Sequence, residues 1–128
     1  MESARLAGMS VFAGLPAQEL AALADSATEV EFGEGEALTT EGDLGHCLFV
    51  IESGAAVAVS SGEPLRELGP GDVVGEIAVL SSGRRTASVV ARTPVRALRW
   101  FKRDVWALDG RAPESARRLR AALDAHRA

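Results

Sequence analysis

The residues best suited to bind an anion lie in one stretch of the chain, Gly75 to Val89, which reads Gly-Glu-Ile-Ala-Val-Leu-Ser-Ser-Gly-Arg-Arg-Thr-Ala-Ser-Val. A glycine opens a short apolar segment with Glu76 in its first turn, a second glycine closes it, and two arginines and two hydroxyl side chains follow. Backbone N–H groups at a helix start attract anions, and a guanidinium group offers two parallel donors to a phosphate. A carboxylate beside them can accept a hydrogen bond from a sugar hydroxyl. The order of these groups indicates a small phosphate pocket.

Two short motifs in this stretch resemble a known family. Gly75-Glu76-Ile77-Ala78, followed by Arg85-Thr86-Ala87, is similar to the phosphate-binding cassette of cyclic nucleotide-binding domains. The fuller string from Gly83 to Val89 is most similar to the cassette of hyperpolarisation-activated and cyclic-nucleotide-gated channels. It also resembles those of catabolite activators and protein kinase regulatory subunits. The resemblance implies a non-enzymatic domain that binds cAMP or cGMP as its ligand and uses no further cofactor.

The resemblance also implies a role for each matching residue. Arg85 would pair with the exocyclic oxygens of the cyclic phosphate, and Glu76 would accept a hydrogen bond from the ribose 2′-OH. Arg84 is expected to be solvated, because neighbours in an extended segment face opposite sides. The expected phosphate and ribose contacts are Gly75, Glu76, Ile77, Ala78, Arg85, Thr86 and Ala87.

Both charged residues of this set have a simpler explanation as well. Arg85 could be an exposed arginine in a turn. Glu76 could serve only the helix dipole, since a carboxylate in the first turn of a helix is favourable there. Five further residues could contact the base. Each of them can also be explained by core packing or by an ordinary position in a strand or helix. These candidates are Val74, Ser88, Leu119, Arg120 and Leu123.

Composition limits the class of protein. The chain has 128 residues, of which 47% are hydrophobic and 25% charged, so we expect one globular domain with a core. It contains no run near the roughly 20 apolar residues that cross a bilayer, and its start lacks a signal pattern. A cytoplasmic protein without membrane insertion is therefore predicted. The single Cys47 excludes an internal disulfide, and adjacent His46 and Cys47 would face opposite sides of a strand, so no metal or catalytic site is expected.

Charge divides the chain into two unlike parts. Residues 1–95 contain 5 Arg and 14 Asp+Glu, net −9, whereas residues 96–128 contain 9 Lys+Arg and 4 Asp+Glu, net +5. The acidic body argues against nucleic acid as a direct partner. The basic part either binds an acidic partner or is a helical region docked on the acidic body, and the second interpretation is preferred.

The N-terminal part is expected to be helical over residues 1–27. Pro16 suits the first position of a helix, and Leu20, Leu23, Ala24 and Ala27 follow at helical spacing. Residues 1–9 show no strong pattern and are expected to be a frayed lead-in.

Residues 28–100 are expected to form the β-roll that positions the cassette. Ten of the thirteen glycines lie between Gly33 and Gly83, where they separate short apolar runs. Such short strands with glycine-rich turns indicate a sandwich, jelly roll or barrel, and the cassette resemblance narrows this to a β-roll, that is, a double-stranded β-helix. The predicted strands are Val30 to Phe32, Ala37 to Thr39, Cys47 to Glu52, Ala55 to Ser60, Leu65 to Leu68, Asp72 to Val74, Thr86 to Ala91 and Val95 to Trp100.

Residues 101–128 are expected to form two helices, and the family resemblance implies that these helices close over the base. Lys102 to Leu108 should be the first, ended by Gly110, and Pro113 should start the second, with Ala112, Ala116, Leu119 and Leu123 on one face. With the N-terminal helix and a short cassette helix, the predicted class is mainly β with flanking helices, in one domain over 1–128.

Function is predicted as a cyclic nucleotide sensor, with cAMP favoured over cGMP. The alternative is a β-roll that binds no ligand and serves protein interaction or dimerisation. An enzyme of the related cupin shape would need a His and carboxylate cluster, which His46 and His126 do not supply. The sequence does not identify the effector that would be regulated. It also leaves open whether the chain forms a homodimer and whether it is a fragment of a longer protein.

Overall fold

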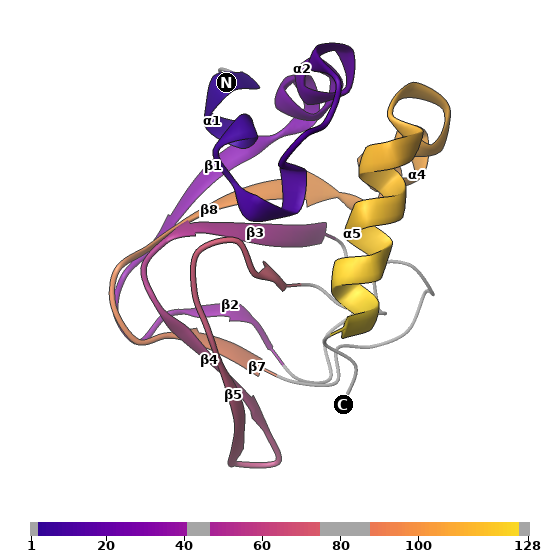
Figure 1. The fold of residues 1–128 in the computed structure, drawn as a ribbon. Helices are drawn as coiled ribbons and strands as arrows, with labels where there is room; N and C mark the ends of the chain where they lie inside the picture. Colours follow the sequence, from indigo (N-terminus) through magenta and orange to yellow (C-terminus); the bar gives the residue numbers. More distant parts are fainter. Residues whose placement is uncertain (1–2, 41–46, 75–87, 126–128) are drawn as a thin grey trace.

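The structure, a computed structural model, describes residues 3–40, 47–74 and 88–125 (Figure 1). Within these residues two four-stranded antiparallel sheets are formed, in the orders β1-β8-β3-β6 and β2-β7-β4-β5. The order confirms the predicted β-roll. The strands are β1 Thr28–Phe32, β2 Ala37–Thr39, β3 Cys47–Ser53, β4 Ala56–Ser60, β5 Glu63–Leu68, β6 Val73–Val74, β7 Ser88–Ala91 and β8 Val95–Phe101.

The first sheet is buried on both faces because successive residues of a strand point to opposite sides. Along β3, Phe49 and Ile51 enter the core between the two sheets, which we call the roll core, whereas Leu48 and Val50 enter a core on the helical side. This explains why four consecutive residues of β3 are buried. The roll core consists of Leu38, Phe49, Ile51, Ala56, Ala58, Leu68, Val74, Val89, Ala91, Val95 and Ala97.

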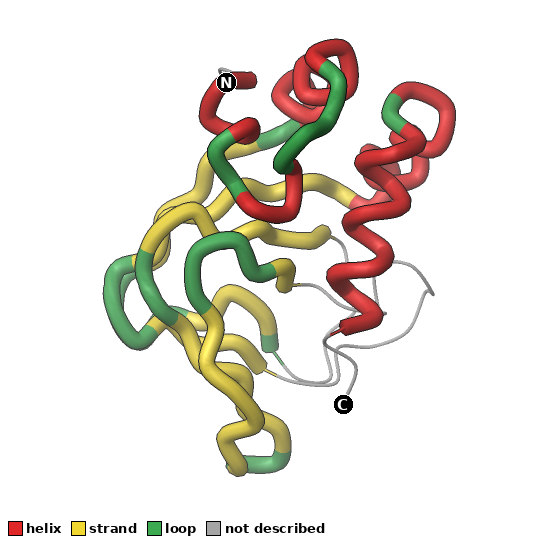
Figure 2. The backbone as a smooth tube through the Cα atoms, in the orientation of Figure 1, coloured by secondary structure: helices red, strands yellow, loops and turns green. Residues whose placement is uncertain are grey.

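Helices cover the outer face of the first sheet and form the helical core with it (Figure 2). Trp100 of β8 is fully buried there, its ring meets Phe12 edge-on at 5.8 Å, and its Nε1–H donates to the Leu23 carbonyl at 3.0 Å. This side chain therefore joins the sheet to the N-terminal helices. The helices are α1 Ser3–Ala7, the 3-10 helix η1 Ser10–Phe12, α2 Ala17–Ser26, α4 Lys102–Arg111 and α5 Pro113–Ala125.

Two expectations at the helix ends were wrong. The lead-in contains α1, whose Leu6 is fully buried. Its Arg5 contacts the carboxylates of Glu52 and Glu29, which raise the pKa of that guanidinium above its usual value. The first C-terminal helix runs through Gly110 to Arg111, since α5 packs beside it and outweighs the weak helix propensity of glycine.

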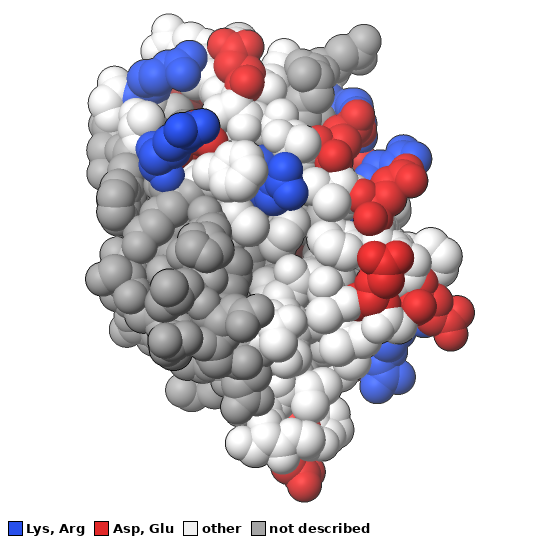
Figure 3. Space-filling view, turned by 180° about the vertical axis from the view of Figure 1, so that it is seen from behind, with Lys and Arg blue, Asp and Glu red and all other residues white. Residues whose placement is uncertain are grey.

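The two oppositely charged parts of the sequence meet on the surface. Arg96 donates to Glu31 at 3.0 Å, and Arg111 lies 3.6 Å from Asp25. The view from behind shows basic and acidic side chains interspersed over the described surface (Figure 3). These pairs are more than half exposed and so contribute little stability, but they agree with a basic C-terminal part docked on the acidic body.

We expect Gly54→Ala to lower the free energy of unfolding by about 1–3 kcal/mol, measured by urea denaturation. Gly54 has φ +97°, and a Cβ there would lie 2.9 Å from the Cα of Val95. Gly62 is the matched control, because it has φ +80° but only open space where a Cβ would lie. Gly62→Ala should therefore cost less, and equal losses in the two variants would contradict the role of the close approach.

Candidate ligand-binding site

The predicted cassette lies between two strands of different sheets. Val74 ends β6, at the edge of one sheet, and Ser88 begins β7, in the middle of the other. The chain therefore passes from one sheet to the other between them. The cassette residues Gly75, Glu76, Ile77, Ala78, Arg85, Thr86 and Ala87 lie outside the described residues, so their contacts remain predictions.

The strand that leads into the cassette touches both cores. Its residues pair with β3, Val73 opposite Val50 and Val74 opposite Phe49. Val74 is buried in the roll core, whereas Val73 is buried in the helical core together with Ala116 of α5. Val74 is thus placed on the interior face at the start of the cassette. Its contact with a base stays a prediction.

Ser88 lies where the chain returns from the cassette. Its neighbour Val89 is buried in the roll core, so strand alternation directs the Ser88 side chain to the opposite face. Ser88 is half-buried and stands opposite Val59 of β4. Its role as a base contact remains a prediction, and alternation favours the competing explanation of an ordinary strand position.

The remaining base candidates lie on α5, which packs beside β6. Ala112 and Ala116, two of the residues predicted to share one helix face, are buried in the helical core at the start of α5. Leu119, Arg120 and Leu123 occupy the C-terminal two thirds of α5, and their side chains lie outside the described part of the structure. Glu114 lies in the first turn of α5. Its carboxyl is hydrogen-bonded mainly to Arg117 and also to Arg118, and both contacts lower its pKa below the usual value.

One basic residue in the same row of the sheet as Val74 was not predicted. Arg99 stands opposite Phe49, in the same row as Val74, so its side chain lies on the interior face of the sheet. Its guanidinium carbon is 4.7 Å from the centre of the Phe101 ring, and its Nε is buried without a hydrogen-bond partner among the described residues. The alternation Val95, Ala97, Arg99 was the signal that could have identified it.

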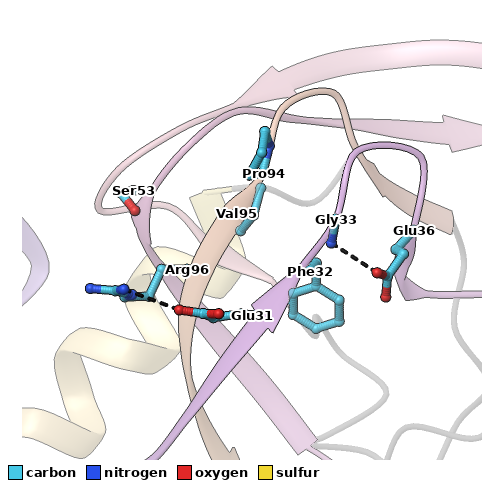
Figure 4. A pocket seen from close by; sticks show the side chains of 8 residues that line it. All are labelled: Glu31, Phe32, Gly33, Glu36, Ser53, Pro94, Val95 and Arg96. Atoms are coloured by element: carbon cyan, nitrogen blue, oxygen red, sulfur yellow. Dashed lines mark hydrogen bonds and ion pairs between the residues drawn. The ribbon is translucent and has the colours of Figure 1, made fainter.

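A cavity of about 610 Å³ opens at the other end of β8 (Figure 4). No predicted site residue lines it. Its charged side chains are already paired, since Glu31 accepts from Arg96 at 3.0 Å and the Glu36 carboxylate accepts from the Gly33 N–H at 2.9 Å. The lining consists of Glu31, Phe32, Gly33, Glu36, Ser53, Pro94, Val95 and Arg96.

Two kinds of feature are lacking in the part of the chain that the structure describes. None of the described helices is long and apolar enough to cross a membrane. The described His, Cys, Asp and Glu side chains form no group of three or more that could hold a metal ion.

The chain matches both a protein-family model and the sequences of individual known proteins. A family model described as the cyclic nucleotide-binding domain matches residues 29–109, which include the whole cassette. The cAMP-dependent protein kinase regulatory subunit of Emericella nidulans is 37% identical over 98 residues, 75% of this chain and 24% of that protein. The chain thus spans about a quarter of the length of the first curated relatives that it matches.

Solved structures with similar folds include the catabolite activator protein of Thermus thermophilus, with a TM-score of 0.80 and 32% identity. That match covers 90% of this chain and 56% of the other. Another is the regulatory subunit of a cAMP-independent protein kinase A from Trypanosoma brucei, with a TM-score of 0.79 and 28% identity, covering 90% and 44%.

Proposed function

The chain belongs to the cyclic nucleotide-binding domain family, and from that premise we propose that it is a cyclic nucleotide sensor without enzymatic activity of its own. The observation that carries the proposal is the family match over residues 29–109, a range that includes Glu76 and Arg85 of the cassette-like motif. In the sequence, the described strands β6 and β7 directly precede and follow the cassette residues 75–87. Cyclic AMP is the favoured ligand because the Emericella nidulans relative is named as cAMP-dependent.

The role proposed for each residue follows from the family resemblance. Arg85 pairs with the cyclic phosphate, Glu76 accepts from the ribose hydroxyl, and Gly75 and Ala78 leave room for backbone N–H groups to approach. Residues of α5 cover the base. A change in the position of α4 and α5 is then the output, which a ligand can drive only through better contacts in one of two states. The partner is an effector protein or an effector domain of a larger chain.

A second candidate function is an interaction module that does not respond to cAMP. The Trypanosoma brucei relative favours this second candidate, since that regulatory subunit is described as belonging to a cAMP-independent kinase. Such a module would self-associate or bind protein without stabilisation by nucleotide. Analytical ultracentrifugation combined with a thermal-shift screen separates it from the sensor.

Isothermal titration calorimetry of the nucleotide-free chain with cAMP and cGMP tests the proposal. A saturable heat with one or both cyclic nucleotides, and none with 5′-AMP, is expected. Mass spectrometry of any ligand carried through purification would identify the preferred base. The absence of binding to either cyclic nucleotide at high micromolar concentration would contradict the sensor function.

A further inference from the structure

The N-terminus of α5 lacks a cap of its own. The Ala112 carbonyl accepts the first intrahelical bond, from Ala116 N at 3.0 Å, which places Ala112 at the N-cap position. An alanine side chain has no acceptor, and Pro113 has no N–H. The N–H groups of the first turn therefore need acceptors from elsewhere in the molecule.

Glu19 of α2 supplies this acceptor. Its Oε1 accepts from the Ser115 N–H at 2.9 Å and from the Ser115 hydroxyl at 3.0 Å. Glu19 is only 6% exposed and Ser115 is fully buried, so water does not replace these bonds easily. The carboxylate also faces the positive end of the α5 dipole. A residue 96 positions earlier in the chain thus performs the role of the missing N-cap.

The Glu19 contact fixes the start of α5 relative to the roll. Helix α2 is joined to β8 through the bond from Trp100 to the Leu23 carbonyl. Arg118, one turn into α5, donates to the Ala13 carbonyl before α2. Beyond this start, α5 lies against β6, where Ala116 and Val73 share the helical core. The helix is therefore held at its N-terminus and lies beside the strand that enters the cassette.

We propose that Glu19 is a positioning residue for the nucleotide site, acting through Ser115 to hold α5 where its later residues cover the bound base. The proposal rests on the proposed function, because it assigns to α5 the covering of a cyclic nucleotide. Glu19 itself is far along the chain from the cassette and acts on the helix, not on the ligand. Losing the contact lowers the fraction of molecules with α5 in the covering position, which lowers apparent affinity.

The test is nucleotide binding by Glu19→Ala, measured by calorimetry and by stopped-flow release of a fluorescent cAMP analogue. We expect affinity for cAMP to fall by about tenfold, within the usual range of coupling between two sites, with most of the change in the dissociation rate. Glu19→Gln retains a carbonyl oxygen as acceptor and should restore most of the affinity. Ser115→Ala removes the hydroxyl but leaves the N–H bond, so its loss should be smaller.

Val95→Ala is the control for general destabilisation, because Val95, the first residue of β8, is buried in the roll core and not in the helical core that contains the start of α5. It should lower stability and leave nucleotide affinity unchanged. Amide hydrogen exchange should accelerate in α5 for Glu19→Ala and not for Val95→Ala, with or without nucleotide.

The outcomes separate the two proposals. Wild-type affinity and dissociation rate in Glu19→Ala, or an equal loss in Val95→Ala, would overturn the positioning role while the sensor function stands. If Glu19→Ala does not fold, Glu19→Gln and Ser115→Ala decide, and wild-type affinity and dissociation rate in both of them contradict the proposal. Failure of the wild-type chain to bind either cyclic nucleotide would overturn the sensor function itself.

Discussion

Replacing Arg85 with alanine should weaken binding of cAMP by about 100-fold or more, because loss of one partner of a desolvated charge pair costs several kcal/mol. The guanidinium is the proposed partner of the cyclic phosphate, and a phosphate left without it keeps its charge but loses two hydrogen bonds. Calorimetry on the variant and the wild type measures the effect. The thermal midpoint without ligand should change little.

Arg84→Ala is the matched control, because it removes the same charge one residue away. It should bind cAMP within a few-fold of the wild type. Equal losses in the two variants would show that only the local positive field matters, and unchanged affinity in Arg85→Ala would contradict the proposed phosphate contact.

The largest effect on stability is expected for Trp100→Ala, at about 3–5 kcal/mol. Trp100 is fully buried, meets the Phe12 ring and donates to the Leu23 carbonyl, so its loss leaves a cavity and removes a buried hydrogen bond between β8 and α2. Urea denaturation followed by circular dichroism measures the change. Trp100→Phe keeps most of the apolar volume and should cost about half as much. A loss below about 1 kcal/mol in Trp100→Ala would contradict the joining role of this side chain.

Strand positions were predictable because glycine-rich turns and short apolar runs are local signals. The prediction of Cys47 to Glu52 as a strand is confirmed within one residue by β3. Both of its faces are buried, however, and only the arrangement of the helices over the first sheet explains that. A run of four buried residues in a strand does not by itself say what covers each face.

Two contacts of the helices could not be predicted, because each depends on residues far apart in the sequence. Helix α1 has five residues, too few for a periodic signal, and is held by burial of Leu6 and by the ion pairs of Arg5. Glu19 looks in the sequence like an ordinary acidic residue in a first helical turn. Its partner Ser115 is identified only by the folded chain.

Only part of the candidate site could be predicted from the sequence. The cassette motif predicts Glu76 and Arg85 as ligand contacts because the resemblance covers short runs of consecutive residues, and these contacts stay predictions. Residues that would cover the base carry no motif, and strand alternation weakens the case for Ser88. Arg99 has no motif either, although its spacing from Val95 and Ala97 indicates the interior face.

Strand β6 has only two described residues, and each belongs to a different core. A shift of this strand therefore changes the packing of Val74 inside the roll and of Val73 against Ala116 of α5 at the same time. Coupling between two binding events is reciprocal, so each ligand changes the affinity of the other by the same factor. A protein that engages α5 and disturbs its contact with Val73 should consequently alter nucleotide affinity as much as nucleotide alters the affinity for that protein. The effector would then act on the sensor as strongly as the sensor acts on the effector.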